Sequence, residues 1–150
     1  MNWNYIAGFF DGEGTLGKYS KSGYKIGITQ SSKKVLEEIQ IFTGLGHIHF
    51  IKKRKSHWQN AWLYYIAKQE DVYFFLNKIL DNLVVKKEVV LKVLPILKKN
   101  IENKRKRRAI YLKKKQLAKI LRRKGLSYRQ IGKRLDIDWG YARRLILDLK

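Results

Sequence analysis

Apolar residues recur at two spacings along the first hundred positions, and the change between the two spacings predicts the elements. Over residues 24–31, Ile26 and Ile28 alternate with polar or small residues, as in a strand with one buried face. Over residues 33–43, Val35, Leu36 and Ile39 recur every three or four positions, as in a helix with one apolar side. The same reasoning predicts further strands at 15–20, 46–53 and 61–67, and helices at 69–80 and from Lys86 onward.

A short apolar helix precedes these elements and ends among glycines. Asn4 is its expected N-cap, and Gly12 and Gly14 are expected to end it with a left-handed backbone. The predicted order is helix-strand-strand-helix-strand-strand-helix, which is an α+β fold with a four-stranded antiparallel sheet. Pro95 is expected to kink or end the last of these helices, because proline cannot donate the helical hydrogen bond.

The end of the first helix carries an unusual charge. Asp11 and Glu13 lie where the helix dipole is negative, a position that disfavours acids. Two carboxylates at this pole predict a bound cation, and Mg2+ prefers such oxygen ligands. Gly8, in the middle of the helix, is unfavourable by roughly 1 kcal/mol relative to Ala. That cost predicts the close approach of a second backbone.

Charge narrows the range of partners. The chain of 150 residues has a formal net charge of +22. Residues 101–150 hold 18 of the 34 Lys and Arg residues and 4 of the 12 Asp and Glu residues, which gives a net charge of +14. Residues 1–100 hold the other 16 Lys and Arg and the other 8 Asp and Glu, which gives a net charge of +8. Such a surplus favours a nucleic acid partner. Neither a long apolar run nor a signal peptide is found, so we expect no membrane association and a location in the cytoplasm or wherever the target DNA lies. The chain has no Cys, which excludes disulfides and thiolate metal sites.

The last third of the chain has its own helical pattern. Residues 98–115 are strongly basic, and a solvated surface and phosphate contacts are both compatible with them. Further on, Ser127 is expected to cap a short helix, Gly132 to let a second helix cross closely, and Asp138 to cap that second helix. The pattern resembles the helix-turn-helix of resolvase-like recombinases and repressors, and a plain helical hairpin is the alternative. The predicted division is a core at 1–100, a basic linker at 101–108 and a helix-turn-helix domain at 109–150.

Residues 6–14 contain the sequence Gly-Phe-Phe-Asp-Gly-Glu-Gly, which resembles the motif of the LAGLIDADG homing endonucleases. In that family two such helices pack side by side, and each brings one catalytic acid to the cleavage centre. The resemblance implies that Glu13 is this acid and a metal ligand, and that the carbonyl of Gly12 is a second metal contact. Asp11 is expected to brace the helix end.

The resemblance also implies further members of the site. Gln30 matches a position that orients a water, with capping of the next helix as the alternative. Lys86 matches the basic residue that opens the last core helix, where it would stabilise transition-state charge, although Lys87 is one position away. The implied cofactor is Mg2+, with Mn2+ as a substitute and Ca2+ binding without cleavage. His47 and His49 share one strand face and are expected to be polar contacts rather than zinc ligands.

The motif occurs once, so the resemblance implies a homodimer that joins two copies about a two-fold axis. The residues predicted for its seam are Ile6, Ala7, Gly8, Phe10 and Asp11. The polar face of the sheet is expected to lie in the major groove of DNA. Its predicted contacts are Tyr19, Lys21, Lys25, Thr29, His47 and His49, and those of the helix-turn-helix are Arg129, Trp139, Tyr141, Arg143 and Arg144.

The function that these features predict is site-specific, metal-dependent cleavage of both strands of DNA at a long, roughly palindromic site. Two other functions fit the same composition. One is a DNA-binding transcriptional regulator that does not cleave, and the other is an RNA maturase that assists intron splicing. Retention of an acid at Glu13 favours the nuclease, and the helix-turn-helix favours DNA over RNA.

Overall fold

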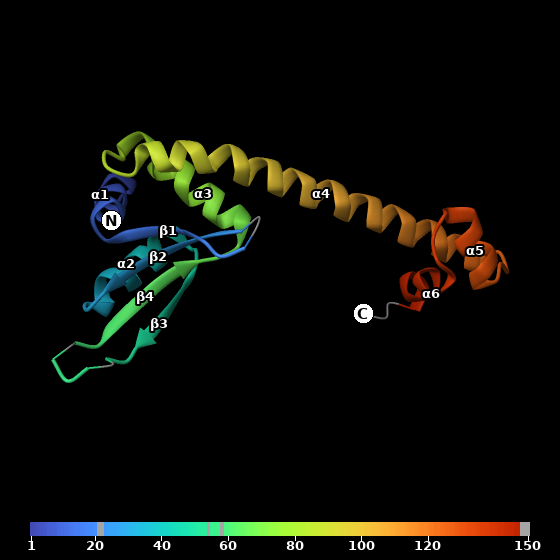
Figure 1. Ribbon diagram of the computed structural model, residues 1–150, viewed down its shortest axis with the longest axis horizontal. Coiled ribbons are helices and arrows are strands. Elements are labelled where there is room, and N and C mark those ends of the chain that lie inside the picture. The colour runs from blue at the N-terminus through green and yellow to red at the C-terminus, as the bar shows by residue number, and fades with distance from the viewer. Residues whose placement is uncertain (21–22, 54, 58, 148–150) are drawn as a thin grey trace. The chain divides into compact units, whose positions relative to one another are not determined.

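The computed structural model describes residues 1–20, 23–53, 55–57 and 59–147, and it consists of two compact units, Met1–Ile101 and Glu102–Lys150. The first unit follows the predicted order of helices and strands (Figure 1). Its elements are α1 (Trp3–Glu13), β1 (Gly14–Lys18), β2 (Tyr24–Gln30), α2 (Lys33–Thr43), β3 (His47–Ile51), β4 (Ala61–Ile66), α3 (Gln69–Ile79), a short 3-10 helix (Leu80–Asn82) and the start of α4 (Lys87–Arg123). The strands form one antiparallel sheet in the order β1-β2-β4-β3. The predicted α+β fold is therefore confirmed.

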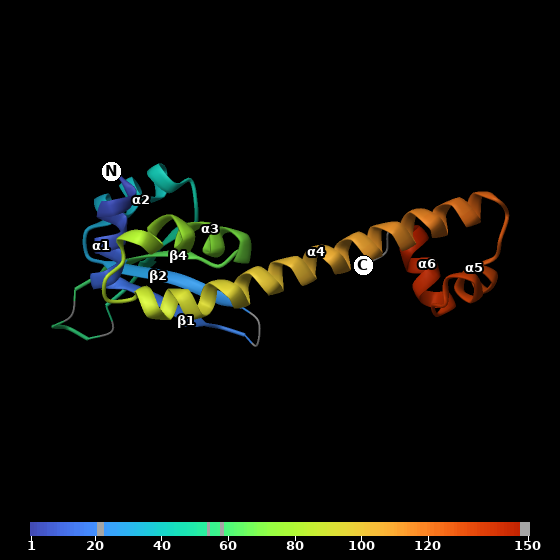
Figure 2. The same cartoon turned by 90° about the horizontal axis from the view of Figure 1, so that it is seen from above.

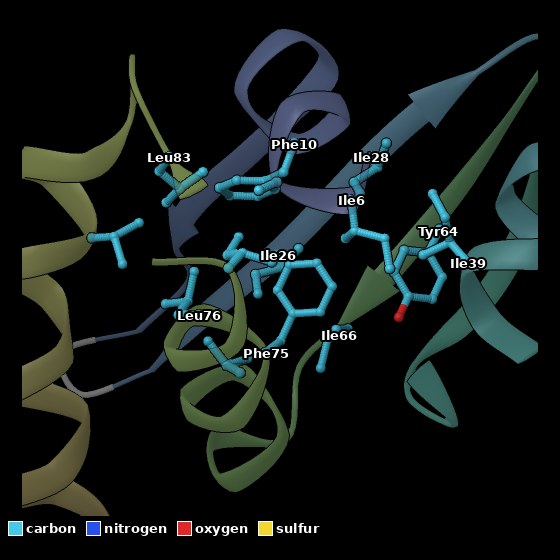
Figure 3. Packing of buried hydrophobic residues seen from close by; sticks show 14 of the residues in the cluster. Ile6, Phe10, Ile26, Ile28, Ile39, Tyr64, Ile66, Phe75, Leu76 and Leu83 are labelled. Carbon is cyan, nitrogen blue, oxygen red and sulfur yellow. The ribbon is translucent and has the colours of Figure 1, made fainter. Parts of the chain in front are cut away.

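The two faces of the sheet have different environments, as the alternation along β2 predicts. Ile26 and Ile28 are fully buried, whereas Lys25 and Thr29 on the opposite face are exposed. Figure 3 shows side chains of α1, β2 and α3 converging in one core, which includes Phe10 and Phe75. The two phenyl rings meet edge to face with centroids 5.9 Å apart. The helices thus cover one face and leave the other open.

Two details of α1 differ from expectation. Its N-cap is Asn2, not Asn4, and the Asn2 side chain accepts the N–H of Tyr5 at 2.9 Å. Gly14 has an extended backbone, with φ −77° and ψ 148°, rather than a left-handed one. A glycine is needed there for a different reason, because any Cβ would collide with the Phe10 ring.

The helix that starts at Lys87 continues further than predicted. It runs through Pro95 to Arg123, so of the two outcomes expected at Pro95, a kink or an end, the end does not occur, and residues 101–108 are helical. Pro95 is exposed, which leaves the carbonyl of Leu91 open to water in place of the lost helical donor. Residues 102–113 of this helix are all exposed. The basic segment is therefore a solvated helical surface, while the independence of the two predicted domains stays a prediction.

In the second unit, α5 (Tyr128–Leu135) and α6 (Trp139–Leu147) pack against the C-terminal part of α4 (Figure 2). Ser127 and Gln130 form a reciprocal capping box at the start of α5. Asp136 takes the left-handed conformation of the turn, with φ 51°. The buried residues of this small core are Ala118, Leu121, Ile131, Ala142 and Leu145. Among the described helices of both units, none is long and apolar enough to span a lipid bilayer.

Candidate functional site

The two sides of α1 have opposite roles. Ile6, Ala7 and Phe10 are 0% exposed, so their side chains belong to the core of the chain itself, which corrects their prediction as seam residues. Gly8 and Gly12, one helical turn apart, lie on the exposed side. No described atom lies within 4 Å of a Cβ built on either glycine. A second chain is therefore able to approach α1 closely along this glycine face.

Asp11 joins the end of α1 to the start of α4. Its carboxylate accepts the backbone N–H groups of Val84 at 2.6 Å, Lys86 at 2.9 Å and Val85 at 3.2 Å. These groups precede α4, so a residue more than 70 positions away acts as its capping acid. Burial alone would raise the pKa of the Asp11 carboxyl, but the three hydrogen bonds and the charge of Lys86 hold it below its ordinary value of 3.8. The carboxylate therefore braces the fold of its own chain, as expected, and the place of Asp11 in the seam stays a prediction.

Lys86 completes the same joint from the other side. Its ammonium donates to the backbone carbonyl of Asp11, one of the acceptors left without a helical partner at the end of α1. The ammonium also lies 5.8 Å from the centroid of the Phe10 ring. The side chain is half-buried, and its charge is fixed beside the residues that follow Asp11. The positive charge that opposes the helix dipole is therefore supplied by another element of the fold.

Glu13 is the acid that this joint leaves available. It is the last residue of α1 and is exposed, and it has no hydrogen bond or ion pair with any residue in the described ranges. Gly12 precedes it on the exposed side of the helix. The two acids thus differ in role, because the Asp11 carboxylate is hydrogen-bonded within the fold and the Glu13 carboxylate is exposed to solvent.

Gln30 lies at the same end of the sheet. Gly14, the residue after α1, pairs with Ile28 in the ladder between β1 and β2, and Gln30 lies two residues beyond Ile28 at the end of β2. Its side-chain oxygen accepts the N–H of Ser31 at 2.9 Å and the Ser31 hydroxyl at 3.2 Å. That oxygen therefore holds the turn before α2, and only the amide N–H groups of Gln30 are left to orient a water.

The donor set fits one half of a divalent-cation site. The described residues contain no group of three His, Cys, Asp or Glu side chains placed to hold a metal ion. One chain offers the Glu13 carboxylate and the Gly12 carbonyl, which are hard oxygen ligands of the kind that Mg2+ and Ca2+ take together with waters. Two copies of the chain brought together at α1 would double this set and supply the charge that one chain lacks.

Polar residues line the open face of the sheet as predicted, with one addition. Lys25, Thr29, His47 and His49 are exposed there. Tyr65, which sequence reasoning missed, lies among them, with its ring centroid 4.9 Å from that of His49 and 5.9 Å from that of His47. Strand β4 is apolar or aromatic at every position, so alternation gave no sign of which of its residues face outward. Tyr19 is exposed beyond the end of β1, and Lys21 lies outside the described residues.

The helix-turn-helix presents most of its predicted contact residues to solvent. Arg129, Trp139, Arg143 and Arg144 are exposed, while Tyr141 packs partly against the small core. Asp138 caps α6 by accepting the N–H groups of Gly140 at 2.8 Å and Tyr141 at 3.1 Å. With Ala142 and Leu145 inward, helical geometry places Arg143 and Arg144 on the outward side.

Comparisons with known proteins agree with this geometry. A family model described as a LAGLIDADG-like domain matches residues 2–80, just over half of the chain. The archaeal intron-encoded homing endonuclease I-Vdi141I, solved in complex with DNA, is 21% identical over 97% of this chain and 94% of its own, with a TM-score of 0.53. The homing endonuclease I-CvuI, solved with its target and 2 mM Ca, is 22% identical over 68% of this chain and 69% of its own, with a TM-score of 0.53.

The LAGLIDADG meganuclease I-AabMI, solved bound to uncleaved DNA, is 20% identical over 77% of this chain and 43% of its own, with a TM-score of 0.54. At these identities the three structures establish the fold alone. A comparison with curated protein sequences gave no significant match. The match of the family model to residues 2–80 establishes membership. The chain belongs to the LAGLIDADG-like domain family.

Proposed function

We propose that the protein is a homodimeric, divalent-metal-dependent endonuclease that cuts both strands of DNA at a specific site. The proposal rests on the different environments of the two acids at the end of α1. The carboxylate of Asp11 is occupied by hydrogen bonds within the chain. Glu13, one position beyond Gly12, is exposed and without a partner in the described parts of the chain. Lys86 offsets the helix dipole at the Asp11 carbonyl, but the Glu13 carboxylate itself has no cation partner among the described residues, which leaves it available to a metal ion.

The glycine face of α1 supports the homodimer. The exposed positions Gly8 and Gly12 let two helices approach closely, and two-fold symmetry would then place two Glu13 side chains near the axis. Each subunit would hold metal through Glu13 and the Gly12 carbonyl. A bound divalent ion would activate a water for attack on the phosphodiester and offset charge on the leaving oxygen.

Residues of the chain would do the remaining work. The fixed ammonium of Lys86 would stabilise negative charge that develops on the phosphate, and it needs no rearrangement to do so. The amide N–H groups of Gln30 would orient a water at the same end of the sheet. The open face of the sheet, with Lys25 and Thr29, would lie in the major groove, and the two-fold axis would require a roughly palindromic site.

The second unit would extend the contact with DNA. Arg143 and Arg144 on the outward side of α6 would enter a neighbouring stretch of groove, as in other helix-turn-helix proteins. The exposed basic segment of α4 would contact phosphates and so add affinity without sequence preference. Such contacts position the duplex, and the sheet reads it.

The test is a cleavage selection from random and genomic duplex DNA with Mg2+, followed by assays on the selected site. Glu13→Gln should abolish cleavage and leave binding near that of the unaltered protein. Glu38→Gln neutralises an exposed acid of α2 that lies beside Met1, Asn2 and Tyr5, at the opposite end of α1 from Glu13; it is the matched control and should cut normally. Cleavage by Glu13→Gln would overturn the proposed metal role. Specific binding by the unaltered protein with no cleavage under Mg2+ or Mn2+ would identify the regulator instead.

A further inference from the structure

The open face of the sheet contains a hollow of about 310 Å3 at the position of Gly27. In the ladders, Gly27 lies between Thr15 on β1 and Tyr65 on β4, so one row of side chains across the sheet lacks its central member. Leu63, on the same face of β4, borders the gap. A Cβ built on Gly27 would lie 2.9 Å from Thr15 Oγ1 and 3.3 Å from Leu63 Cδ1. At these distances Thr15 or Leu63 would have to shift to admit a Cβ, so only glycine leaves both residues where they line the hollow.

The floor and the rim of the hollow differ in chemistry. The Thr15 hydroxyl lies nearest to Gly27 and donates to its carbonyl at 3.1 Å, so its proton is committed to the protein. The Leu63 side chain and the Tyr65 ring supply the apolar part of the floor. Lys25 and His49 line the same hollow and are exposed. A group that fits must therefore present an apolar surface with a hydrogen-bond acceptor beside it.

In the major groove, one base has this combination. Thymine carries an apolar C5-methyl group next to the O4 acceptor, whereas cytosine presents an N4–H donor that would face the Lys25 ammonium. Purines offer acceptors but no apolar substituent in this groove. We propose that the hollow at Gly27 binds the C5-methyl group of a thymine and makes Gly27, Thr15 and Leu63 determinants of sequence specificity. The inference rests on the proposed function, since it requires the sheet to lie in the groove.

The methyl group can be tested by itself, because uracil differs from thymine only in its absence. Duplexes would first be selected for binding from a random library, and the selected duplex would be resynthesised with uracil in place of each thymine in turn. At one thymine in each half-site, uracil should weaken binding about fourfold, the factor that burial of one methyl group corresponds to. Uracil at the remaining thymines should change affinity by less than about twofold.

Variants of the hollow then assign the effect to this face. Gly27→Ala adds a methyl group that Thr15 and Leu63 must move to admit, so it changes the shape of the hollow and should remove the difference between thymine and uracil at the sensitive position. Thr15→Ser keeps the hydroxyl that bonds to Gly27 and loses only the methyl, so it should reduce the difference without disturbing the sheet. Ile41→Val removes one methyl group from an exposed residue of α2, on the other side of the sheet, and the difference should persist. Thermal unfolding followed by circular dichroism would establish that each variant is folded.

The outcomes separate the two proposals. If no duplex is enriched, the proposed DNA recognition fails and the inference fails with it. If a duplex is enriched but no thymine responds to uracil, or if the response is unchanged in both Gly27→Ala and Thr15→Ser, the inference is overturned while the proposed function stands. A response at one thymine per half-site that is lost in Gly27→Ala and kept in Ile41→Val would support it.

Discussion

The joint between Asp11 and α4 gives the sharpest prediction about stability. Asp11→Asn removes the negative charge and one of the two acceptor oxygens that hold the N–H groups of Val84, Val85 and Lys86. Asp11→Ala removes both oxygens. Each change leaves backbone donors at the start of α4 without their partner, and it leaves the Lys86 ammonium beside a helix end without the neighbouring carboxylate.

The magnitude follows from the role of Asp11 as a capping acid. Replacement of a helix N-cap by Ala costs about 0.5–2 kcal/mol. Val84 and Val85 are 85% and 75% exposed, so water can replace part of what the carboxylate supplies. We therefore expect a loss in the free energy of unfolding of about 1 kcal/mol for Asp11→Asn, and a larger loss, within about 2 kcal/mol, for Asp11→Ala.

The effect should also depend on pH in a defined direction. The pKa of the Asp11 carboxyl is lower in the folded protein than its ordinary value of 3.8. The stabilisation by its charge is therefore present above pH 3.8 and is lost as the pH falls through the lower, folded pKa. The difference between the unaltered protein and Asp11→Asn should be full at neutral pH and should shrink below pH 3.8.

Urea unfolding at a series of pH values would measure this difference, and hydrogen exchange at the Val84, Val85 and Lys86 amides would locate it. Glu13→Gln is the control, since it removes a charge from the same turn without removing any hydrogen bond to a described residue. It should leave the free energy of unfolding unchanged or slightly higher, because an acid at a helix C-terminus is unfavourable. Equal stability of Asp11→Asn and the unaltered protein, or unchanged exchange at the three amides, would refute the capping role.

Three further predictions concern other parts of the chain. Gly8→Ala should stabilise the isolated subunit by about 1 kcal/mol, because Ala has the higher helix propensity. The same change should weaken the homodimer in sedimentation experiments, since it adds a side chain to the exposed glycine face of α1. An unaffected dimer would exclude α1 as the seam. Arg143→Ala combined with Arg144→Ala should weaken DNA binding. It should also reduce the slope of log affinity against log salt by about one for each phosphate that the variant no longer neutralises. An unchanged slope would exclude a role of these arginines in phosphate binding. Burial raises the pKa of the Tyr64 hydroxyl to about 12 from 10.0, so stability should fall as the pH rises between these values, and Tyr64→Phe should lessen that fall in alkaline unfolding curves.

Much of the fold was predictable because local patterns and tertiary packing agree in it. The alternation of Ile26 and Ile28 with polar residues marked the buried face of β2, and the helix at 33–43 coincides with α2. Of the two outcomes expected at Pro95, a kink or an end, the end does not occur, because solvent reaches that side of α4 and the helix continues. The seam prediction was wrong for the side chains of Ile6 and Ala7, since apolar character alone does not distinguish a core residue from a seam residue.

The sequence by itself determined the class of fold, the family motif and the surplus of positive charge, because each depends on the order and type of residues along the chain. Tertiary structure decided which of two neighbouring acids is available. Asp11 is occupied because Val84, Val85 and Lys86 fold back onto it from more than 70 positions away, a proximity that no local pattern encodes. The hollow at Gly27 was likewise hidden from the sequence, because it forms only when three strands align in register and one row across them lacks a side chain.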